Sequence, residues 1–234
     1  MIKNKKIICL IVAKKNSTGL KNKNILPLAG KPLIHWTFSA AKKSKFIDQI
    51  ILSTDSKLII KIAKKQKIHV PFVRPKKLAN VNSSIYDVIS HAKKSYSSFK
   101  KYDYLILLQP TTPFRSSQHL DAALKKFVSS RPKSQTTLVS VTKIPKKAHW
   151  LLKKINKNYI RLLNNKITKY VNRQDVEDLY IPNGAIYICK IKNFKNNFYT
   201  KKIMFFLMDD ISSIDIDSKK DFELVKTKAK KLLK

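Results

Sequence analysis

The sequence is poor in cysteine and in long apolar runs, and each shortage excludes a class of protein. Only two of the 234 residues are cysteine, Cys9 and Cys189, and both fall in apolar runs that we expect to form core strands. Buried thiols in a reducing compartment therefore fit better than a disulfide framework or a thiolate metal site. No apolar stretch reaches the roughly 20 residues that span a bilayer, so the sequence predicts no membrane segment.

The N-terminus also lacks the features of a signal peptide. Residues 1–6 are basic, but the apolar run after them gives way to Lys14 and Lys15 without a small-residue cleavage site. This order is typical of a strand followed by a loop and not of a secretory leader. We therefore expect a cytoplasmic protein.

Acidic residues are the third shortage. The chain holds 14 of them against 50 lysines and arginines, which gives a formal net charge of +36. Such a balance alone suggests nucleic acid or an anionic surface as the partner. The lysines, however, are spread along the whole chain instead of forming one block. A general bias towards lysine would produce the same even distribution, so we expect no dedicated nucleic-acid binding. The positive charge would still attract a polyanionic substrate as a side effect.

A chain of this length with 43% hydrophobic residues can bury the core of one large domain. In its first part, short apolar runs alternate with segments of helical periodicity. We expect strands at 7–12, 49–55, 69–73 and 104–108, and helices at 32–44, 56–67, 85–97 and 116–128. This alternation predicts an α/β fold with right-handed crossovers and a mainly parallel sheet.

The regular pattern is lost between residues 145 and 180. Lysines, asparagines and isolated aromatic residues alternate there without a sustained period, which indicates an excursion from the sheet. On either side of it we expect the core strands 137–141, 183–189 and 203–208, followed by a last helix at 218–233. No linker or internal repeat divides the chain, so we expect a single domain over 1–234.

The loop at residues 11–24 has the composition of a phosphate cradle. It leaves the strand at 7–12 and holds Gly19, one of three glycines in the chain, with four lysines and three asparagines. Such a loop can turn sharply while its amide and ammonium groups face an anion. A solvated basic turn would look similar. Position favours a ligand site, because open α/β sheets bind ligands beyond the carboxyl ends of their strands.

Two of the scarce carboxylates lie two residues apart, at Asp215 and Asp217. In an extended segment such residues point the same way, so the pair can present two carboxylates to one hard cation. An ordinary capped turn before the last helix is the alternative, since aspartate is common at helix starts. The scarcity of acids and the position of the pair just after the expected strand at 203–208 favour a metal site.

The loop and its continuation to Ile34 resemble the nucleotide-binding loop of the CMP-sialic acid synthetases, also called acylneuraminate cytidylyltransferases. Six further segments resemble motifs of that family, in the family's order. They lie at 52–56, 74–79, 107–115, 173–175, 182–187 and 213–217. The resemblance therefore covers essentially the full chain.

The resemblance implies a Rossmann-like nucleotidyltransferase fold with helices on both faces of the sheet. It also implies that 145–180 is an inserted dimerisation arm and that the protein is a homodimer. The implied reaction transfers CMP from CTP to the anomeric hydroxyl of a nonulosonic acid and releases pyrophosphate, with Mg²⁺ as the cofactor. This reaction needs cations and a metal that offset charge at the phosphates, so lysines and two aspartates are suitable residues.

Roles for individual residues follow from the same resemblance. It implies nucleotide binding by Lys14, Ser17, Asn24, Arg74, Ser83 and Gln109, and sugar binding by Gln109, Arg173 and Gln174. The implied catalytic residues are Lys14, Lys23, Arg173, Asp215 and Asp217, and the two aspartates would also hold Mg²⁺.

The sequence departs from the family at four positions. Lys14 stands where the family has arginine, and Thr18 replaces the lysine expected just before the loop glycine. Val81 and Ile181 stand where an acid and an arginine are usual. Two alternatives therefore stay open: a catalytically weak nucleotide-binding homologue, suggested by Thr18, and a basic nucleic-acid-binding protein, suggested by net charge alone.

Overall fold

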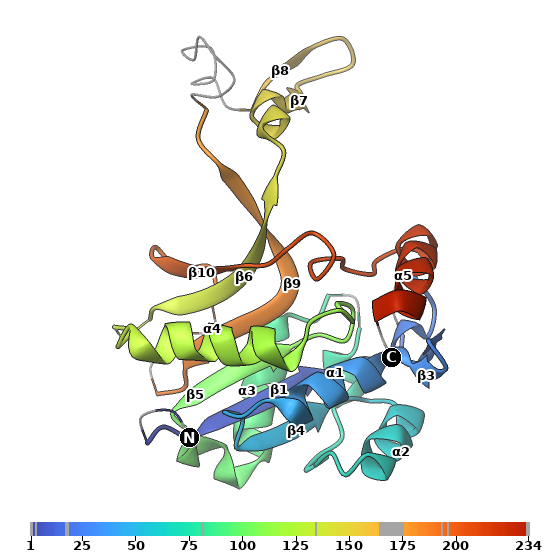
Figure 1. Cartoon of the computed structure of the whole chain (residues 1–234), viewed down its shortest axis with the longest axis vertical. Coiled ribbons are helices and arrows are strands. Elements are labelled where there is room, and N and C mark those ends of the chain that lie inside the picture. The colour runs from blue at the N-terminus through green and yellow to red at the C-terminus, as the bar shows by residue number, and fades with distance from the viewer. Residues whose placement is uncertain are drawn as a thin grey trace.

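The central sheet is mainly parallel (Figure 1). The computed structural model describes residues 2, 4–16, 19–80, 82–133, 135–163, 176–192, 194–195 and 197–232. In sheet order the strands are β10 (Ile203–Leu207), β6 (Thr137–Ile144), β9 (Leu179–Lys190), β5 (Tyr104–Leu108), β1 (Ile7–Val12) and β4 (Gln49–Ser53). Among these strands only β9 runs antiparallel to its neighbours. The predicted sheet is thus confirmed.

Helices cover both faces of the sheet, as predicted. They are α1 (Leu33–Lys43), α2 (Lys57–Lys65), α3 (Ile85–Ser95), α4 (Ser117–Ser129) and α5 (Lys219–Leu232). Helices α1 and α4 pack together on one face, and α3 covers the other. Shorter elements are the 3-10 turns η1 (Lys23–Ile25), η2 (Lys76–Leu78) and η3 (Ser97–Lys101) and the paired segments β2 (Pro27–Leu28) and β3 (Lys31–Pro32).

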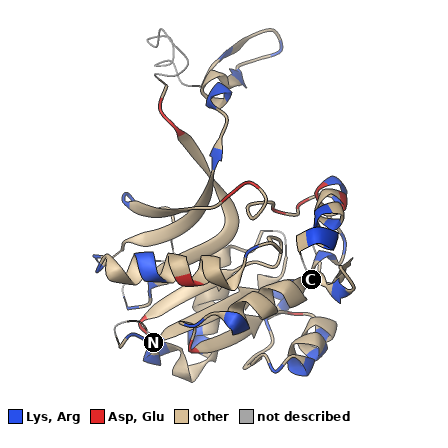
Figure 2. Cartoon of the chain, in the orientation of Figure 1, with Lys and Arg blue, Asp and Glu red and all other residues tan. Residues whose placement is uncertain are grey.

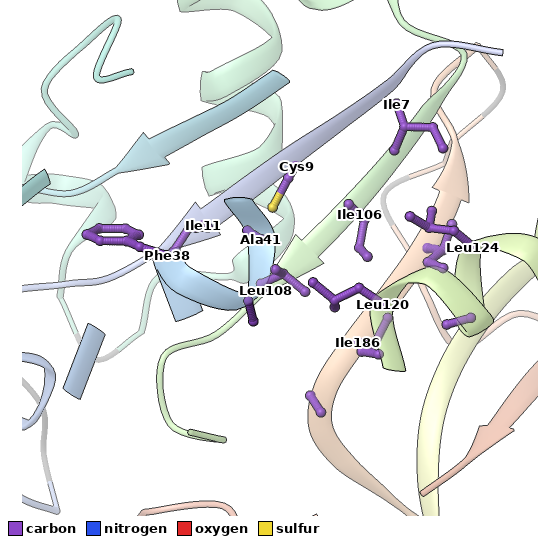
Figure 3. Close-up of a cluster of buried hydrophobic side chains, with 14 of the residues drawn as sticks. Ile7, Cys9, Ile11, Phe38, Ala41, Ile106, Leu108, Leu120, Leu124 and Ile186 are labelled. Carbon is purple, nitrogen blue, oxygen red and sulfur yellow. The ribbon is translucent and has the colours of Figure 1, made fainter. Parts of the chain in front are cut away.

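Strand β1 lies in the middle of the core, and all six of its residues are buried. Its odd-numbered side chains enter a cluster with α1 and α4, part of which Figure 3 shows, and its even-numbered side chains enter a cluster with α3. A strand that is covered on both faces must be apolar throughout, which explains its unbroken hydrophobic run. Cys9 on this strand and Cys189 on β9 are buried free thiols, as predicted.

Residues 69–73 do not form the strand that we predicted. His69 makes one isolated parallel bridge to Ile51. Pro71 has no N–H to donate, so a hydrogen-bond ladder cannot continue through this segment. The chain runs on as a loop and returns to the end of β4, where the Arg74 N–H donates to the Thr54 carbonyl at 2.9 Å.

Strand β10 is an edge strand and not the core strand that we predicted at 203–208. Within the described residues it pairs with β6 alone. Its side chains Ile203, Phe205 and Leu207 are 41–50% exposed. A continuous apolar run therefore marked a strand with one open face. A turn at 209–213 also separates β10 from the aspartate pair, which does not follow the strand directly.

Strands β6 and β9 continue past the sheet into an arm, which projects from the body in Figure 1. The arm carries η4 (Lys146–Trp150) and a hairpin of β7 (Leu152–Lys154) and β8 (Ile160–Leu162). Residues 164–175 lie outside the described ranges. The described residues 145–163 therefore form an excursion from the sheet, and the role of the arm in dimerisation stays a prediction.

Charge is distributed as the sequence suggested. Figure 2 shows lysine and arginine on the helices and the arm, whereas most central strands carry none; acidic residues are few and recur along the segment between β10 and α5. None of the helices in the described ranges has both the length and the apolar character that crossing a membrane would require.

Candidate active site

A pocket of about 360 Å³ opens where β1 and β5 end. Its walls come from three segments that are far apart in the sequence: the loop after β1, the loop after β5 and the segment before α5. The lining residues are Val12, Lys14, Gly19, Lys23, Asn24, Gln109, Pro110, Thr111 and Asp217. The pocket therefore lies at the carboxyl edge of the parallel strands, where the fold class places its ligands.

The loop after β1 is held in shape by its own polar groups. The Asn24 side-chain amide donates to the Lys14 carbonyl at 2.9 Å, and the Lys15 N–H donates to Asp55 Oδ1 at 2.8 Å. Asp55 follows β4, so the neighbouring strand fixes the basic loop. Asn22 adopts a left-handed conformation, with φ 55°, and starts the turn η1 that carries Lys23.

Lys23 joins the basic loop to the aspartate segment. Its side chain is only 10% exposed, its Nζ donates to the Ile216 carbonyl, and the same Nζ lies 3.2 Å from Asp217 Oδ1. The two loops also touch through their backbones, because a Cβ on Gly19 would lie 2.1 Å from the Asp217 carbonyl oxygen. Only glycine permits this approach. The structure thus brings together the lysine loop and the aspartates, while their chemical roles stay predictions.

Asp215 sits deeper than Asp217. A Cβ on Gly184, which has φ +72°, would lie 3.1 Å from its Oδ2, so the carboxylate rests directly on this glycine. Burial raises the pKa of Asp215, the Thr111 hydroxyl lowers it and the charge of Asp217 raises it further. Within the described residues, its buried Oδ1 has no hydrogen-bond partner.

That unpartnered oxygen fits a cation ligand, because a buried carboxylate oxygen without a donor is costly. Asp217 offers a second carboxylate, 81% exposed beside the pocket. In the described ranges no cluster of three or more acidic, histidine or cysteine side chains accompanies them. Two carboxylates suit Mg²⁺, which usually completes its coordination with substrate phosphates and water.

A buried polar network lies beneath the aspartate segment, and sequence reasoning assigned it no role. Ser140 on β6 donates to Asn183 Oδ1 at 2.6 Å, and the Asn183 amide donates to Ser213 Oγ at 2.8 Å. The Ser140 hydroxyl also accepts from the Ile186 N–H at 2.7 Å. Polar residues inside otherwise apolar strands were the available signal. The network ties β6, β9 and the segment before Asp215 into one unit.

Two predicted nucleotide-binding residues do not line the pocket. Arg74 is buried beside β4, where it donates to the carbonyl and hydroxyl of Ser53 at 2.6 and 3.0 Å. Burial lowers its pKa to about 10, against the effect of Asp55. The Ser83 hydroxyl lies 2.9 Å from the Lys77 carbonyl and closes its own loop. The structure thus gives both side chains partners outside the pocket.

Three other predicted residues cannot be placed. Ser17, Arg173 and Gln174 lie outside the described residues, as does Thr18, the most serious departure from the family pattern. Of the predicted set, the pocket lining includes Lys14, Lys23, Asn24, Gln109 and Asp217, with Asp215 behind Thr111.

A mainly parallel α/β sheet with a basic loop and two aspartates at one rim defines the class of Rossmann-like nucleotidyltransferases. The family model described as cytidylyltransferase matches residues 8–232. The chain therefore belongs to the cytidylyltransferase family.

Individual relatives agree with this assignment. The chain is 34% identical over 224 residues to the N-acylneuraminate cytidylyltransferase of Escherichia coli O18:K1:H7, covering 95% of this chain and 52% of that protein. It is also 34% identical over 225 residues to the CMP-N,N'-diacetyllegionaminic acid synthase of Legionella pneumophila, covering 94% of each. The chain thus spans about half the length of the first of these relatives and nearly all of the second.

A solved structure shares the fold. The CMP:2-keto-3-deoxy-manno-octonic acid synthetase complexed with CTP superposes with a TM-score of 0.69 at 14% identity, covering 95% of this chain and 97% of the other. At this identity the likeness concerns the fold alone.

Proposed function

We propose that the protein transfers CMP from CTP to the anomeric hydroxyl of a nonulosonic acid and releases pyrophosphate. The observation that carries this proposal is the convergence of Lys14, Lys23 and Asp217 on one pocket, with Asp215 beside it. A triphosphate needs cations and a metal site at the same place. The names of the N-acylneuraminate and legionaminic acid relatives support a nonulosonic acid as the acceptor.

In this proposal each residue of the pocket has a separate role in binding CTP. Lys14 and Lys23 hold the triphosphate as point charges, since an ammonium group lacks the fork of a guanidinium. Gln109 reads the cytosine edge, because a side-chain amide offers both a donor and an acceptor. Asn24 contributes indirectly: its side-chain amide donates to the Lys14 carbonyl and so fixes the loop that carries Lys14. Ser17, Arg74, Ser83, Arg173 and Gln174 keep the nucleotide or sugar roles that the family resemblance implies.

Asp215 and Asp217 would hold Mg²⁺, for which the unpartnered oxygen of Asp215 is the structural support. When bound, the ion would neutralise charge on the phosphates as the bond to pyrophosphate breaks. Lys23 lines the pocket and faces Asp217, so its ammonium group lies where it can bind a phosphate oxygen. The chain itself thus supplies positioning and charge, which is most of what this reaction requires.

We also propose that the arm at 145–180 joins two copies of this single-domain chain into a homodimer. Its support is a set of large apolar side chains that are each 43–66% exposed: Trp150, Leu151, Leu152, Ile155, Tyr159, Ile160 and Leu163. So many exposed large apolar side chains on one short segment are typical of an interaction site. We place the enzyme in the cytoplasm, because its two thiols are free and CTP is its substrate.

Incubation with CTP, Mg²⁺ and a panel of nonulosonic acids tests the proposal. The panel holds N-acetylneuraminic, legionaminic, pseudaminic and Kdo-type acids. We expect pyrophosphate release with at least one acid, together with a product of the mass of its CMP ester. Absence of both signals across the whole panel would contradict the proposed reaction. Reactions with ATP in place of CTP serve as the base-specificity control.

A further inference from the structure

Arg115 is a buried arginine on the loop that follows β5, and the proposed mechanism gives it no role. It closes the loop between β5 and α4 and is 2% exposed. None of the ion pairs found among the described residues includes it. Burial lowers its pKa to about 10, while Cys9 and Asp215 act in the opposite direction. Burying a cation without a contacting carboxylate is unfavourable, so the residue needs a reason to be there.

The hydrogen bonds of Arg115 reach three parts of the fold. Its Nη1 lies 3.1 Å from the carbonyls of Gln109 and Ala185 and 2.7 Å from Thr112 Oγ1. Its Nη2 donates to Thr37 Oγ1 on α1 at 2.7 Å. A planar group with five donors can serve these acceptors together, whereas the single nitrogen of lysine cannot.

The two carbonyls belong to neighbouring strands of the sheet, since Gln109 directly follows β5 and Ala185 lies in β9. Gln109 lines the pocket on the β5 side. Ala185 follows Gly184, the glycine on which the Asp215 carboxylate rests. One guanidinium therefore ties the segment that carries the base-reading side chain to the segment that supports the metal-binding carboxylate.

We propose that Arg115 is a positioning residue for CMP transfer, which fixes Gln109 relative to Asp215 through the Gln109 and Ala185 carbonyls. The inference rests on the proposed function. It assigns Arg115 no contact with substrate: the residue acts through the geometry of the two segments. Loss of the planar fork should therefore disturb nucleotide and metal binding together.

Arg115→Lys and Arg115→Met test this inference, with the exposed Arg131→Lys as the matched control. The measurements are kcat, KM for CTP, the Mg²⁺ concentration for half-maximal rate, calorimetric affinity for CTP with Mg²⁺, and the unfolding temperature. We expect both Arg115 variants to lose about 10- to 100-fold in kcat and in CTP affinity, as when supporting partners of metal ligands are removed. Arg131→Lys should match the wild type.

Folded Arg115 variants whose kcat, Mg²⁺ requirement and CTP affinity all stay within about twofold of the wild type would overturn the inference. If these variants do not fold, we use the double variant Thr37→Val/Thr112→Val, which at nearly constant volume removes the two hydroxyl acceptors that hold the guanidinium against the Gln109 and Ala185 carbonyls. It should lower kcat and CTP affinity several-fold, and wild-type values there would overturn the inference equally. A wild-type chain that neither binds CTP nor releases pyrophosphate would instead refute the proposed function, and this inference with it.

Discussion

At the pocket rim, the side chains of the lysine loop contact partners within the chain, whereas the arm exposes its apolar side chains to solvent. Lys23 reaches the aspartate segment, and Asn24 holds the Lys14 carbonyl. On the arm, Tyr159, Ile160 and Leu163 are 61–66% exposed. The contacts of the pocket rim lie within one copy of the chain, whereas the arm has an exposed apolar surface that a second copy could cover.

The rim and the arm therefore depend on different contacts for their shape. The rim is cross-linked by contacts between segments from opposite ends of the sequence, so the pocket should form in one copy of the chain. The arm buries few of its own apolar side chains, so its order should depend on a second copy. Four sets of substitutions test this difference between the rim and the arm.

The largest effect should come from the aspartates. Asp215→Asn or Asp217→Asn should lower kcat by at least about 100-fold, because a catalytic metal is worth several kcal/mol and each ~1.4 kcal/mol is tenfold in rate. Stability should not fall for Asp215→Asn at neutral pH, because burial raises the pKa of this carboxyl and so disfavours its ionised form in the folded state. Pyrophosphate release and thermal unfolding check both statements.

Asp210→Asn is the matched control for these variants. Asp210 is exposed in the same segment, accepts a hydrogen bond from Thr142 at 3.0 Å and does not line the pocket. It loses the same charge, so full activity is expected. Undiminished Mg²⁺-dependent turnover in either pocket variant would show that the metal assignment is wrong.

Gly19→Ala should come next. The new Cβ would collide with the Asp217 carbonyl oxygen and push the two loops apart. A misplacement of about 1 Å can cost about 100-fold, so we expect a loss of that order in kcat/KM for CTP.

Gly30→Ala provides the contrast. Gly30 has φ +75° and nothing within 4 Å of an added Cβ, so this change strains the backbone without a collision. It should cost about 1–2 kcal/mol of stability and leave kcat/KM unchanged. Equal losses of activity in the two variants would mean that the loop contact has no special importance.

Substitutions on the arm should change the oligomeric state of the protein and leave the fold of its central domain intact. Leu151→Glu with Ile160→Glu places charge on two exposed apolar positions of the arm and should convert a dimer into a monomer in sedimentation experiments. Leu58→Glu, at a position on α2 that is 50% exposed, should leave the dimer intact. A wild-type monomer, or a dimer that survives the arm substitutions, would contradict the proposed role.

The smallest effect should come from Thr18→Lys. Lys14 and Lys23 already line the pocket, so the lysine that the family has at this position should change kcat by less than about tenfold. A large gain in the rate of pyrophosphate release would instead support the alternative of a catalytically weak homologue.

Much of the body could be predicted because its patterns are local. The unbroken apolar runs of β1 and β5 indicated buried strands, and the carboxyl-edge rule marked the loop that carries Lys23 as a ligand site. At 69–73 the local signal was misread, because Pro71 within the segment stops the strand. At 203–208 the local pattern failed, because only the neighbouring strands decide that the apolar run lies at the edge of the sheet.

The supporting residues of the site could not be predicted, since their partners are distant in sequence. The role of Arg115 depends on its hydrogen bond to the Ala185 carbonyl, and the role of Asn183 depends on its hydrogen bonds with Ser140 and Ser213. Gly19 looked like a turn residue, but its close approach to Asp217 is what requires it. Such constraints come from tertiary packing, which no local pattern encodes.

A crystal structure with CTP and Mg²⁺ tests the central claim most directly. We expect the triphosphate to lie between Lys14 and Lys23, the cytosine to contact Gln109, and a cation to bind Asp215 and Asp217. CTP bound elsewhere, or a triphosphate without contact to the segment before α5, would contradict the claim.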